Sequence, residues 1–290
     1  MQPFVNSSDL LSQPDALRVR MNKDGYLFLP GLLTRKTVGE VYDTLMRICQ
    51  EQAWVDEDGQ AVDPIRLEGE DAFWDVYDPL QKSEAFHGLA HRQEILDVIE
   101  TLVEEPPFVH PRNIARIVYP QTAHFTTPAH QDFVHIQGAK ATYTAWFPLS
   151  DCPKDMGTLI VLAGSHKQEL LPVHKAAGAG GLGVETEGLG LDWHGSDFNA
   201  GDVLLFHSHT VHKALPNRKE KTLRFSVDYR YQGVHQPIVA DGLQPHYNRL
   251  TWDEIYEGWT QPKLQYYWRD LSMTIAERDA SIRETADEHG

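Results

Sequence analysis

The feature that most constrains the fold is a series of short apolar runs between residues 108 and 235. Each run is rich in β-branched and aromatic side chains, and Gly, Pro, Asn or Asp separates it from the next. Short strands with turn residues between them are typical of a β-sandwich or barrel. The runs are IARIVY (114–119), DFVHIQ (132–137), ATYTAWFPL (141–149), TLIVLAG (158–164), DVLLFHSH (202–209) and TLRFSVDYRYQ (222–232).

Helical patterns flank this β-rich part. On its N-terminal side, DGYLFLPGLL (24–33) predicts a short buried strand that ends at Pro30-Gly31. The apolar residues that follow recur at the spacing of one helical face, and Glu40 stands three residues after Thr37 as in a capping box. The same spacing predicts a second helix, which carries Ile95, Val98, Ile99 and Leu102.

Three further stretches complete the chain. Residues 51–82 are acidic and rich in Trp and Asp, and we expect an irregular excursion there. Residues 176–197 are glycine-rich and too long for a hairpin turn; a loop of this length in a compact domain is typical of either a functional lid or a disordered segment, and a lid is expected here. Beyond Thr251, aromatic residues at helical spacing predict another helix.

No internal repeat and no linker divides the sequence, so a single domain over residues 1–290 is predicted. A helical part to about residue 107 is expected to precede a β core over about 108–235, and a helical extension over about 245–290 is expected to follow it. The predicted fold class is therefore mainly β with flanking α-helices.

Charge and composition exclude several classes of partner. The 290 residues include 26 Lys and Arg against 42 Asp and Glu, which gives a net charge of −16. Such a chain repels phosphate backbones and anionic lipid, so neither nucleic acid nor a membrane is expected as a partner. No signal peptide is recognised, and the two cysteines do not suggest a disulfide framework, so a cytoplasmic location is predicted. Composition leaves the oligomeric state open.

The stretch TPAHQDFVHIQG (127–138) contains a candidate metal-binding pair. In a strand, residues two positions apart point to the same side, so His130 and Asp132 can bind one ion from a single segment. Two histidines and one carboxylate, with the remaining positions open, are typical of non-haem Fe(II) oxygenases. The spacing alone is weak evidence because the chain has 15 histidines and many acidic residues. The simpler interpretation is a polar turn.

A metal site also needs a second histidine, and the carboxylate of a cofactor would need an anchor. GDVLLFHSHTVHKALPN (201–217) offers His207, His209 and His212, among which spacing does not choose. On the run 222–232, Arg224, Ser226, Asp228 and Arg230 share one face. That face is either exposed to water or carries a guanidinium that holds a carboxylate.

Several motifs in the same order make the chain resemble the phytanoyl-CoA dioxygenase family, over about residues 24–232. These motifs are DGYLFLPGLL, His130-Gln131-Asp132, WFPLSD (146–151), GTLIVLAGSHK (157–167), GDVLLFH (201–207), HKALPN (212–217) and Arg224. The family consists of Fe(II)- and 2-oxoglutarate-dependent oxygenases, and the resemblance implies a double-stranded β-helix, the jelly-roll fold of cupins. The sequence departs from the family at MGT (156–158), where Gly-Gly is common, and at Ala163, where Pro is frequent.

The resemblance also implies the site and its cofactors. His130, Asp132 and His212 would bind Fe(II) and form the catalytic centre. Arg224 would bind the far carboxylate of 2-oxoglutarate, with Trp146 and Thr127 lining the cofactor pocket. O2 would be the co-substrate, succinate and CO2 would be released, and an aliphatic C–H bond of a small molecule would be hydroxylated. Because the carboxylate of Asp132 is present, hydroxylation rather than halogenation is expected.

The substrate is less constrained by the sequence. Arg116, Arg230 and His135 are the candidate substrate-binding residues, and Arg112 could also meet an anionic group; surface salt bridges are the simpler interpretation of these arginines. Three other functions remain open. The first is a cupin-like metalloenzyme that does not use 2-oxoglutarate, such as an isomerase. The second is a zinc hydrolase, and the third is a non-catalytic jelly-roll binding protein.

Overall fold

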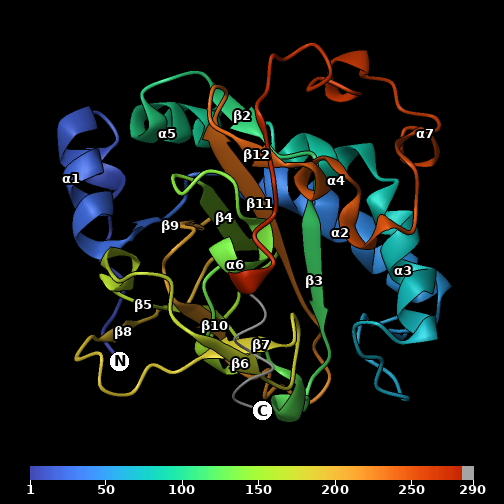
Figure 1. The fold of residues 1–290 in the computed structure, drawn as a ribbon. Coiled ribbons are helices and arrows are strands. Elements are labelled where there is room, and N and C mark those ends of the chain that lie inside the picture. Colours follow the sequence, from blue (N-terminus) through green and yellow to red (C-terminus); the bar gives the residue numbers. More distant parts are fainter. Residues whose placement is uncertain (283–290) are drawn as a thin grey trace.

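A computed structural model describes residues 1–282 of the chain (Figure 1). Its largest sheet has six strands, all antiparallel to their neighbours, in the order β1-β9-β4-β11-β2, with β3 also paired to β11. The strands are β1 (Tyr26–Leu29), β2 (Pro107–Val109), β3 (Ile114–Val118), β4 (Tyr143–Pro148), β9 (Val203–His207) and β11 (Arg224–Gly233). The strand predicted in residues 24–33 thus joins the sheet as β1, although it lies far from the others in sequence.

A smaller antiparallel sheet of order β10-β5-β8 faces the large one and completes the β-helix. Its strands are β5 (Leu159–Leu162), β8 (Trp193–His194) and β10 (His212–Ala214). Two pairs of strands stand apart from both sheets: the antiparallel β6 (Val173–Lys175) and β7 (Leu182–Val184), and the parallel β12 (Ile238–Val239) and β13 (Ile275–Ala276). The predicted mainly β fold with flanking helices is confirmed.

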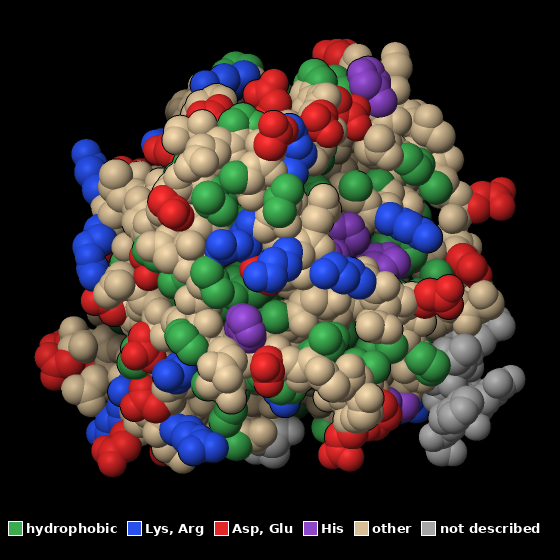
Figure 2. Space-filling model, turned by 90° about the vertical axis from the view of Figure 1, so that its left-hand side faces the viewer, with side chains coloured by type: hydrophobic (Ala, Val, Ile, Leu, Met, Phe, Trp, Pro, Cys, Tyr) green, Lys and Arg blue, Asp and Glu red, His purple; other side chains and the backbone are tan. Residues whose placement is uncertain are grey.

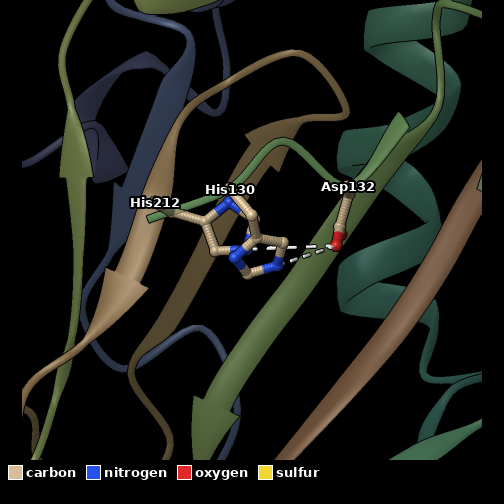
Figure 3. Close-up of side chains that lie close together, drawn as sticks. All are labelled: His130, Asp132 and His212. Atoms are coloured by element: carbon tan, nitrogen blue, oxygen red, sulfur yellow. Dashed lines mark ion pairs between the residues drawn. The ribbon is translucent and has the colours of Figure 1, made fainter. Parts of the chain in front are cut away.

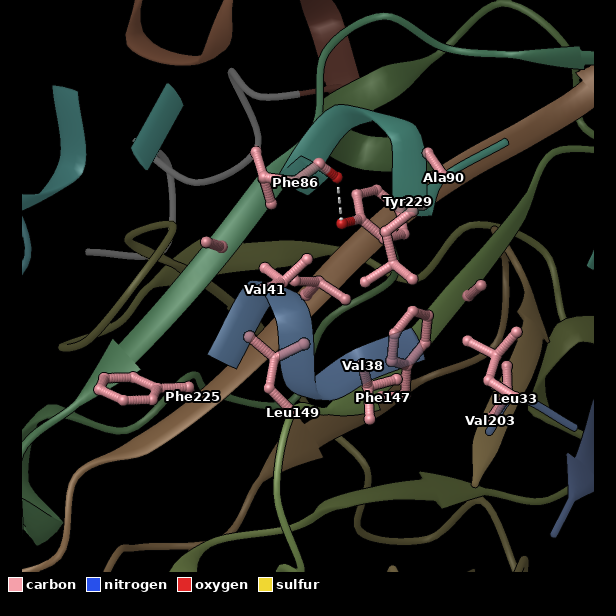
Figure 4. Packing of buried hydrophobic residues seen from close by; sticks show 14 of the residues in the cluster. Leu33, Val38, Val41, Phe86, Ala90, Phe147, Leu149, Val203, Phe225 and Tyr229 are labelled. Atoms are coloured by element: carbon pink, nitrogen blue, oxygen red, sulfur yellow. Dashed lines mark hydrogen bonds between the residues drawn. The ribbon is translucent and has the colours of Figure 1, made fainter. Parts of the chain in front are cut away.

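Five helices cover one face of the large sheet (Figure 1). They are α1 (Pro14–Asp24), α2 (Arg35–Glu51), α3 (Asp71–Gln81), α4 (Glu84–Leu89) and α5 (Gln93–Val103). Their buried side chains and those of the sheet form one apolar cluster, and Figure 4 shows Val38 and Val41 of α2 beside Phe147 and Tyr229 of the strands. Burial of apolar surface on this scale is the main stabilising contribution to a fold.

Strand β11 separates this core from the interior of the β-helix. Phe225, Val227 and Tyr229 belong to the cluster beneath the helices, as the two-residue period of a strand requires. Arg224 and Arg230 lie on the opposite face and are nevertheless buried, with 3% and 7% exposure. The polar face of this strand therefore lines the interior of the molecule, and the alternative of a water-exposed outer face is wrong.

Three local predictions were wrong. Residues 51–82 include the helix α3, whose buried residues Phe73, Val76, Tyr77 and Leu80 follow the helical period. The run 132–137 is not a strand but forms the one-turn helix α6 (Phe133–Ile136). Helix α2 begins one turn earlier than expected, because Thr34 rather than Thr37 caps it by accepting a hydrogen bond from the backbone N–H of Thr37.

The C-terminal part is less helical than the sequence predicts. The four-residue helix α7 (Trp252–Ile255) begins with a capping box of Thr251 and Glu254, and the ring of Trp252 packs with that of Trp268 in a separate apolar cluster. Short 3₁₀ turns and the strand β13 make up much of the rest of this segment. The end of the predicted helical extension, residues 283–290, lies outside the described residues.

The surface in Figure 2 carries charged side chains of both signs. On the face in Figure 2, Lys and Arg side chains gather near the centre with histidines beside them, and acidic side chains lie mainly toward the edges. Among residues 1–282, no helix has the length and apolar character needed to cross a bilayer. Cys49 and Cys152 are buried free thiols.

Candidate metal centre and active site

His130, Asp132 and His212 come together inside the β-helix (Figure 3). One ligand atom from each residue lies within 4.8 Å of the other two, and no other such group of three occurs in residues 1–282. The Oδ1 atom of Asp132 is 3.6 Å from Nε2 of His130 and 3.9 Å from Nε2 of His212. All three side chains are buried, with exposures of 8% or less.

The backbone places these side chains by two local devices. His130 and His212 face each other in an isolated antiparallel bridge, in which each backbone N–H donates to the other's carbonyl at 3.0 Å. After His130 the chain leaves the extended conformation, because Asp132 has helical φ and ψ and stands at the N-cap position of α6. The turn of α6 therefore directs the carboxylate toward the two imidazoles, where a continuous strand was expected to do so.

Both imidazoles are oriented to bind a metal ion. Nδ1 of His130 lies 2.9 Å from the carbonyl oxygen of Pro128, and Nδ1 of His212 lies 3.0 Å from that of Thr210. A carbonyl only accepts, so each Nδ1 carries the proton and each Nε2 keeps a free lone pair toward Asp132. Burial, with the neighbouring His130, lowers the pKa of His212 to about 3, which keeps it neutral as metal binding requires.

The carboxylate of Asp132 is held from two further directions. The hydroxyl of Thr144 donates to Oδ2 at 2.6 Å, and Nη2 of Arg230 lies 3.3 Å from Oδ1. Burial alone would raise the pKa of the carboxyl, but the positive charge of Arg230 outweighs it and holds that pKa well below its usual range. An ionised carboxylate with two neutral imidazoles suits a divalent transition metal, so these three residues fit the implied iron.

The predicted cofactor-binding residues surround a small cavity next to this centre. Arg224, Trp146 and Thr127 line it together with His130, Asp132 and His212. Nη1 of Arg224 donates to the carbonyl oxygen of Gly157 at 3.0 Å, and its guanidinium lies 5.9 Å from the centre of the Trp146 ring.

Arg224 has unused hydrogen-bonding capacity. Its Nε is buried and has no partner, which is rare for a charged group and indicates a missing acceptor. Gly157 has φ +92°, and a Cβ there would lie 2.6 Å from the carbonyl oxygen of Leu215, so the residue beneath the guanidinium must be glycine. The donor set fits a carboxylate such as that of 2-oxoglutarate.

A larger cavity of about 300 Å³ opens on the other side of His130 and Asp132. All three candidate substrate-binding residues line it: Arg116, Arg230 and His135. Its apolar wall consists of Ile114, Ile136 and Ile238, together with Ala179 and Gly180 from the segment between β6 and β7. The sequence did not indicate that the C-terminal segment also contributes, through Arg278.

His207 and His209 do not join the metal-binding group. The ring centre of His209 lies 4.7 Å from that of Phe133 and 5.6 Å from that of His207. Nε2 of His209 is buried without a partner. Sequence reasoning missed Thr144, although the period of β4 places its side chain on the same face as that of Trp146.

The fold and this centre define a class: a double-stranded β-helix that carries a two-histidine, one-carboxylate metal site. Residues 21–225 match the family described as phytanoyl-CoA dioxygenase (PhyH), and the chain belongs to that family. The family and the fold predicted from the sequence are therefore confirmed.

Individual relatives agree with this class. The chain is 28% identical, over 84% of its length and 90% of the relative's, to 1-deoxypentalenic acid 11-beta-hydroxylase of Streptomyces exfoliatus. Two enzymes of nogalamycin biosynthesis share the fold. The epimerase SnoN, in complex with Fe3+, alpha ketoglutarate and nogalamycin RO, has a TM-score of 0.57 and 21% identity over 78% of this chain and 85% of its own. The alpha ketoglutarate dependent carbocyclase SnoK has a TM-score of 0.56 and 21% identity over 87% and 94%.

Proposed function

We propose that this protein is an Fe(II)- and 2-oxoglutarate-dependent dioxygenase that hydroxylates an aliphatic C–H bond of a small molecule. The enzyme class follows from its family and agrees with the hydroxylase relatives and the iron- and alpha-ketoglutarate-bound neighbour. The observation that carries the proposal is the convergence of two imidazole lone pairs and one carboxylate on a single buried point. Three protein ligands leave room for a bidentate keto acid and O2.

Each residue has a distinct part in this scheme. His130, Asp132 and His212 hold the iron, and Arg224 binds the distal carboxylate of 2-oxoglutarate beside Trp146 and Thr127. When bound, iron and 2-oxoglutarate supply the oxidising chemistry, with succinate and CO2 as co-products. The chain itself positions the substrate C–H bond from the larger cavity, which shares His130 and Asp132 with the cofactor cavity.

The competing functions make different demands on the site. A zinc hydrolase needs no keto acid, and its chemistry gives the buried Nε of Arg224 no acceptor. A non-catalytic jelly-roll protein needs neither the metal ligands nor the cation. The hydroxylase relative acts, by its name, on a small acid, and we propose a small-molecule substrate here as well.

An anoxic titration tests the proposal. The protein is loaded with Fe(II) and then titrated with 2-oxoglutarate, and the weak visible absorption band of a keto acid chelated to Fe(II) is followed. The expected result is a saturable band with one equivalent of iron. Stoichiometric metal binding without this band would favour an enzyme that does not use 2-oxoglutarate.

Replacement of Arg224 tests the position of the cofactor. Truncating one partner of a buried charged pair costs on the order of 2–5 kcal/mol, so Arg224→Ala should weaken 2-oxoglutarate binding roughly thirtyfold or more in the same titration. Arg224→Lys should recover only part of the loss, because an ammonium lacks the planar fork. Iron binding should change little. If Arg230→Ala bound 2-oxoglutarate much more weakly while Arg224→Ala bound it normally, the cofactor carboxylate would be assigned to Arg230 instead.

A further inference from the structure

The wall of the 300 Å³ cavity is rich in positive charge, although the whole chain carries −16. Arg112, Arg116, Arg230 and Arg278 all line it. Like charges gather in a partly buried space only when counter-charges compensate them. The partners of each guanidinium therefore show which charges are available to a ligand.

Two of these arginines are neutralised by the protein. Arg116 donates to Glu68 at 3.1 Å and to Asp228 at 3.1 Å, so its charge is fully compensated. Arg278 pairs with Asp241 at 3.1 Å and also donates to the carbonyl oxygen of His135. Carboxylates compensate both charges, so these two guanidinium groups mainly shape the wall, although Nη1 of Arg278 is buried without a partner.

Arg112 has no carboxylate partner among the described residues. Its guanidinium donates only to neutral acceptors, namely the carbonyl oxygens of Gln244 and Pro245 and the side-chain oxygen of Asn248. These bonds fix the guanidinium in place, and its charge is offset only in part by the nearby carboxylate of Asp241, which pairs with Arg278. Burial, and then the positive charges of Arg230 and Arg278, lower the pKa of Arg112, so an anion at this position would relieve a real electrostatic cost.

Arg230 has one acidic partner among the described residues, and that partner is the metal ligand. Its Nη2 lies 3.3 Å from Oδ1 of Asp132, the oxygen that also faces Nε2 of His130 and of His212. Nε of Arg230 is buried and has no acceptor. A metal ion on Oδ1 competes with the guanidinium for the same lone pairs, so metal binding makes the charge of Arg230 available.

We propose that Arg112 and Arg230 form an anion seat that binds a carboxylate of the substrate at the wall of the larger cavity. The apolar body of the substrate would lie against Ile114, Ile136 and Ile238. The substrate class is thus a small, largely aliphatic carboxylic acid, held beside the metal centre. This inference rests on the proposed function for the position of the reacting centre. It also predicts that metal and anion binding reinforce each other, because both act on the contact between Arg230 and Asp132.

A pair of probes with equal shape and different charge tests the seat. Adamantane-1-carboxylic acid and adamantane-1-carboxamide are titrated calorimetrically, under anoxia, into protein saturated with Fe(II) and 2-oxoglutarate. Saturation with 2-oxoglutarate keeps the probes away from Arg224. A buried charge-assisted contact is worth more than a factor of ten in affinity, so the acid should bind at least about tenfold more tightly than the amide. In metal-free protein this preference should fall to about threefold, because Arg230 remains paired with Asp132.

Substitutions then separate the seat from a general effect of charge. Arg112→Gln and Arg230→Gln should each reduce the preference for the acid to about threefold or less, with the affinity for the amide almost unchanged. Arg47→Gln is the matched control, since Arg47 is an exposed residue of α2 that pairs with Glu51. Each variant is checked for the absorption band of the bound keto acid, so that damage to the metal centre is recognised.

The two proposals fail in different ways. Suppose that the protein shows the keto-acid band but binds the acid and the amide equally well, or binds neither. This result would overturn the anion seat and leave the dioxygenase function intact. If the protein never shows the band but prefers the acid, and this preference depends on Arg112 and Arg230, the result would support the seat and refute the proposed function. An acid preference that survives both substitutions would also overturn the seat.

Discussion

At the scale of single residues, Asp132 receives more of the interactions of the site than any other side chain described above. One carboxylate oxygen faces both imidazoles and Arg230, and the other accepts from Thr144. The spacing of His130 and Asp132 and the family resemblance were enough to predict the three side chains that the fold brings together. The support from Thr144 was not predictable, because a threonine in an apolar strand has the same sequence pattern whether it binds a partner or only packs.

The choice of His212 as the second histidine ligand leads to the first prediction. His130→Ala, Asp132→Ala and His212→Ala should each lose stoichiometric Fe(II) after anoxic loading and desalting, because two remaining ligands bind the ion weakly. His209→Ala should retain its iron, since that ring packs against Phe133 instead. Iron content is measured by a colorimetric assay. If His209→Ala lost iron while His212→Ala kept it, the assignment of the distal ligand would be wrong.

The bond from Thr144 to Asp132 leads to the second prediction. Thr144→Val keeps the volume of a fully buried side chain but removes the donor to Oδ2, which then has no hydrogen-bond donor among the described residues. Loss of such an outer contact lowers metal affinity by roughly 10–100-fold. Competition with a chelator of known affinity measures the change. Thr144→Ser, which retains the hydroxyl, is the control and should stay within about threefold of wild type. Equal affinity in all three proteins would remove Thr144 from the site.

At the scale of elements, the most clearly periodic segments were predictable, whereas the helix α3 and the short helix α6 were not. The strands β4, β9 and β11 and the helices α2 and α5 follow clear two-residue or helical periods. The run that forms α6 has only four helical residues, and so short an apolar run does not distinguish a helix from a strand. Its conformation is set by tertiary contacts, such as the bond from the N–H of Phe133 to the carbonyl of Ser208.

The glycine-rich stretch 176–197 is the element expected to act as a lid. Its first part is the turn between β6 and β7, where Ala179 and Gly180 line the larger cavity. Gly178 has φ +109°, and a Cβ there would overlap the carbonyl oxygen of Thr126. Only glycine allows this turn to lie so close to the segment that precedes the metal ligands.

Limited proteolysis tests the lid. Cleavage within 176–197 should be slower when Fe(II), 2-oxoglutarate and a carboxylate probe are bound than in the metal-free protein, because ordering a glycine-rich segment requires compensating contacts. Gly178→Ala should displace the turn and remove most of this protection. Gly188→Ala is the control for backbone strain alone, because Gly188 also has a positive φ (+84°) but its Cβ would meet nothing. Equal cleavage rates in the bound and metal-free protein would exclude a closing motion.

At the scale of the whole molecule, the helices protect a core that includes an ionisable group. His87 on α4 is fully surrounded: Nε2 lies 2.9 Å from the carbonyl oxygen of Gln81, and Nδ1 lies 3.0 Å from the amide nitrogen of Asn113. This arrangement requires a neutral ring with its proton on Nε2. Burial is the main reason that the pKa of His87 is lowered to about 4.

This lowered pKa predicts how stability depends on pH. Above pH 6.5 the ring is neutral in both the folded and the unfolded chain. Between pH 6.5 and about 4 only the unfolded chain binds the proton, so the free energy of unfolding falls as the pH decreases. At pH 5 the contribution of His87 amounts to about 2 kcal/mol. Urea unfolding of the metal-free protein measures the free energy of unfolding at pH 7 and at pH 5. The decrease between the two pH values should be smaller in His87→Gln than in the wild type by about this amount.

A second histidine serves as the control for this experiment. His235 is exposed, so His235→Gln should lose the same stability between pH 7 and pH 5 as the wild type. The same loss in His87→Gln as in the wild type would mean that another group carries the acid sensitivity.

The overall arrangement was predictable only through the resemblance. Periodicity indicates which residues face a core, but it does not show that β1 pairs with β9 or that the C-terminal segment reaches the cavity through Arg278. Such contacts join residues that are far apart in sequence. They depend on how the sheets close and are not encoded in a local pattern.

Strand β11 has a consequence for how this enzyme can diverge. Its odd-numbered residues from Phe225 to Tyr231 hold the helices on the sheet, while Arg224 and Arg230 on its even positions face the two cavities. Inserting or deleting one residue would exchange the two sets and place guanidinium groups in the apolar core, so length changes here are excluded. Replacements at single even positions leave the odd set untouched. New substrate preferences can therefore arise along this strand by substitution, one position at a time, without rebuilding the scaffold.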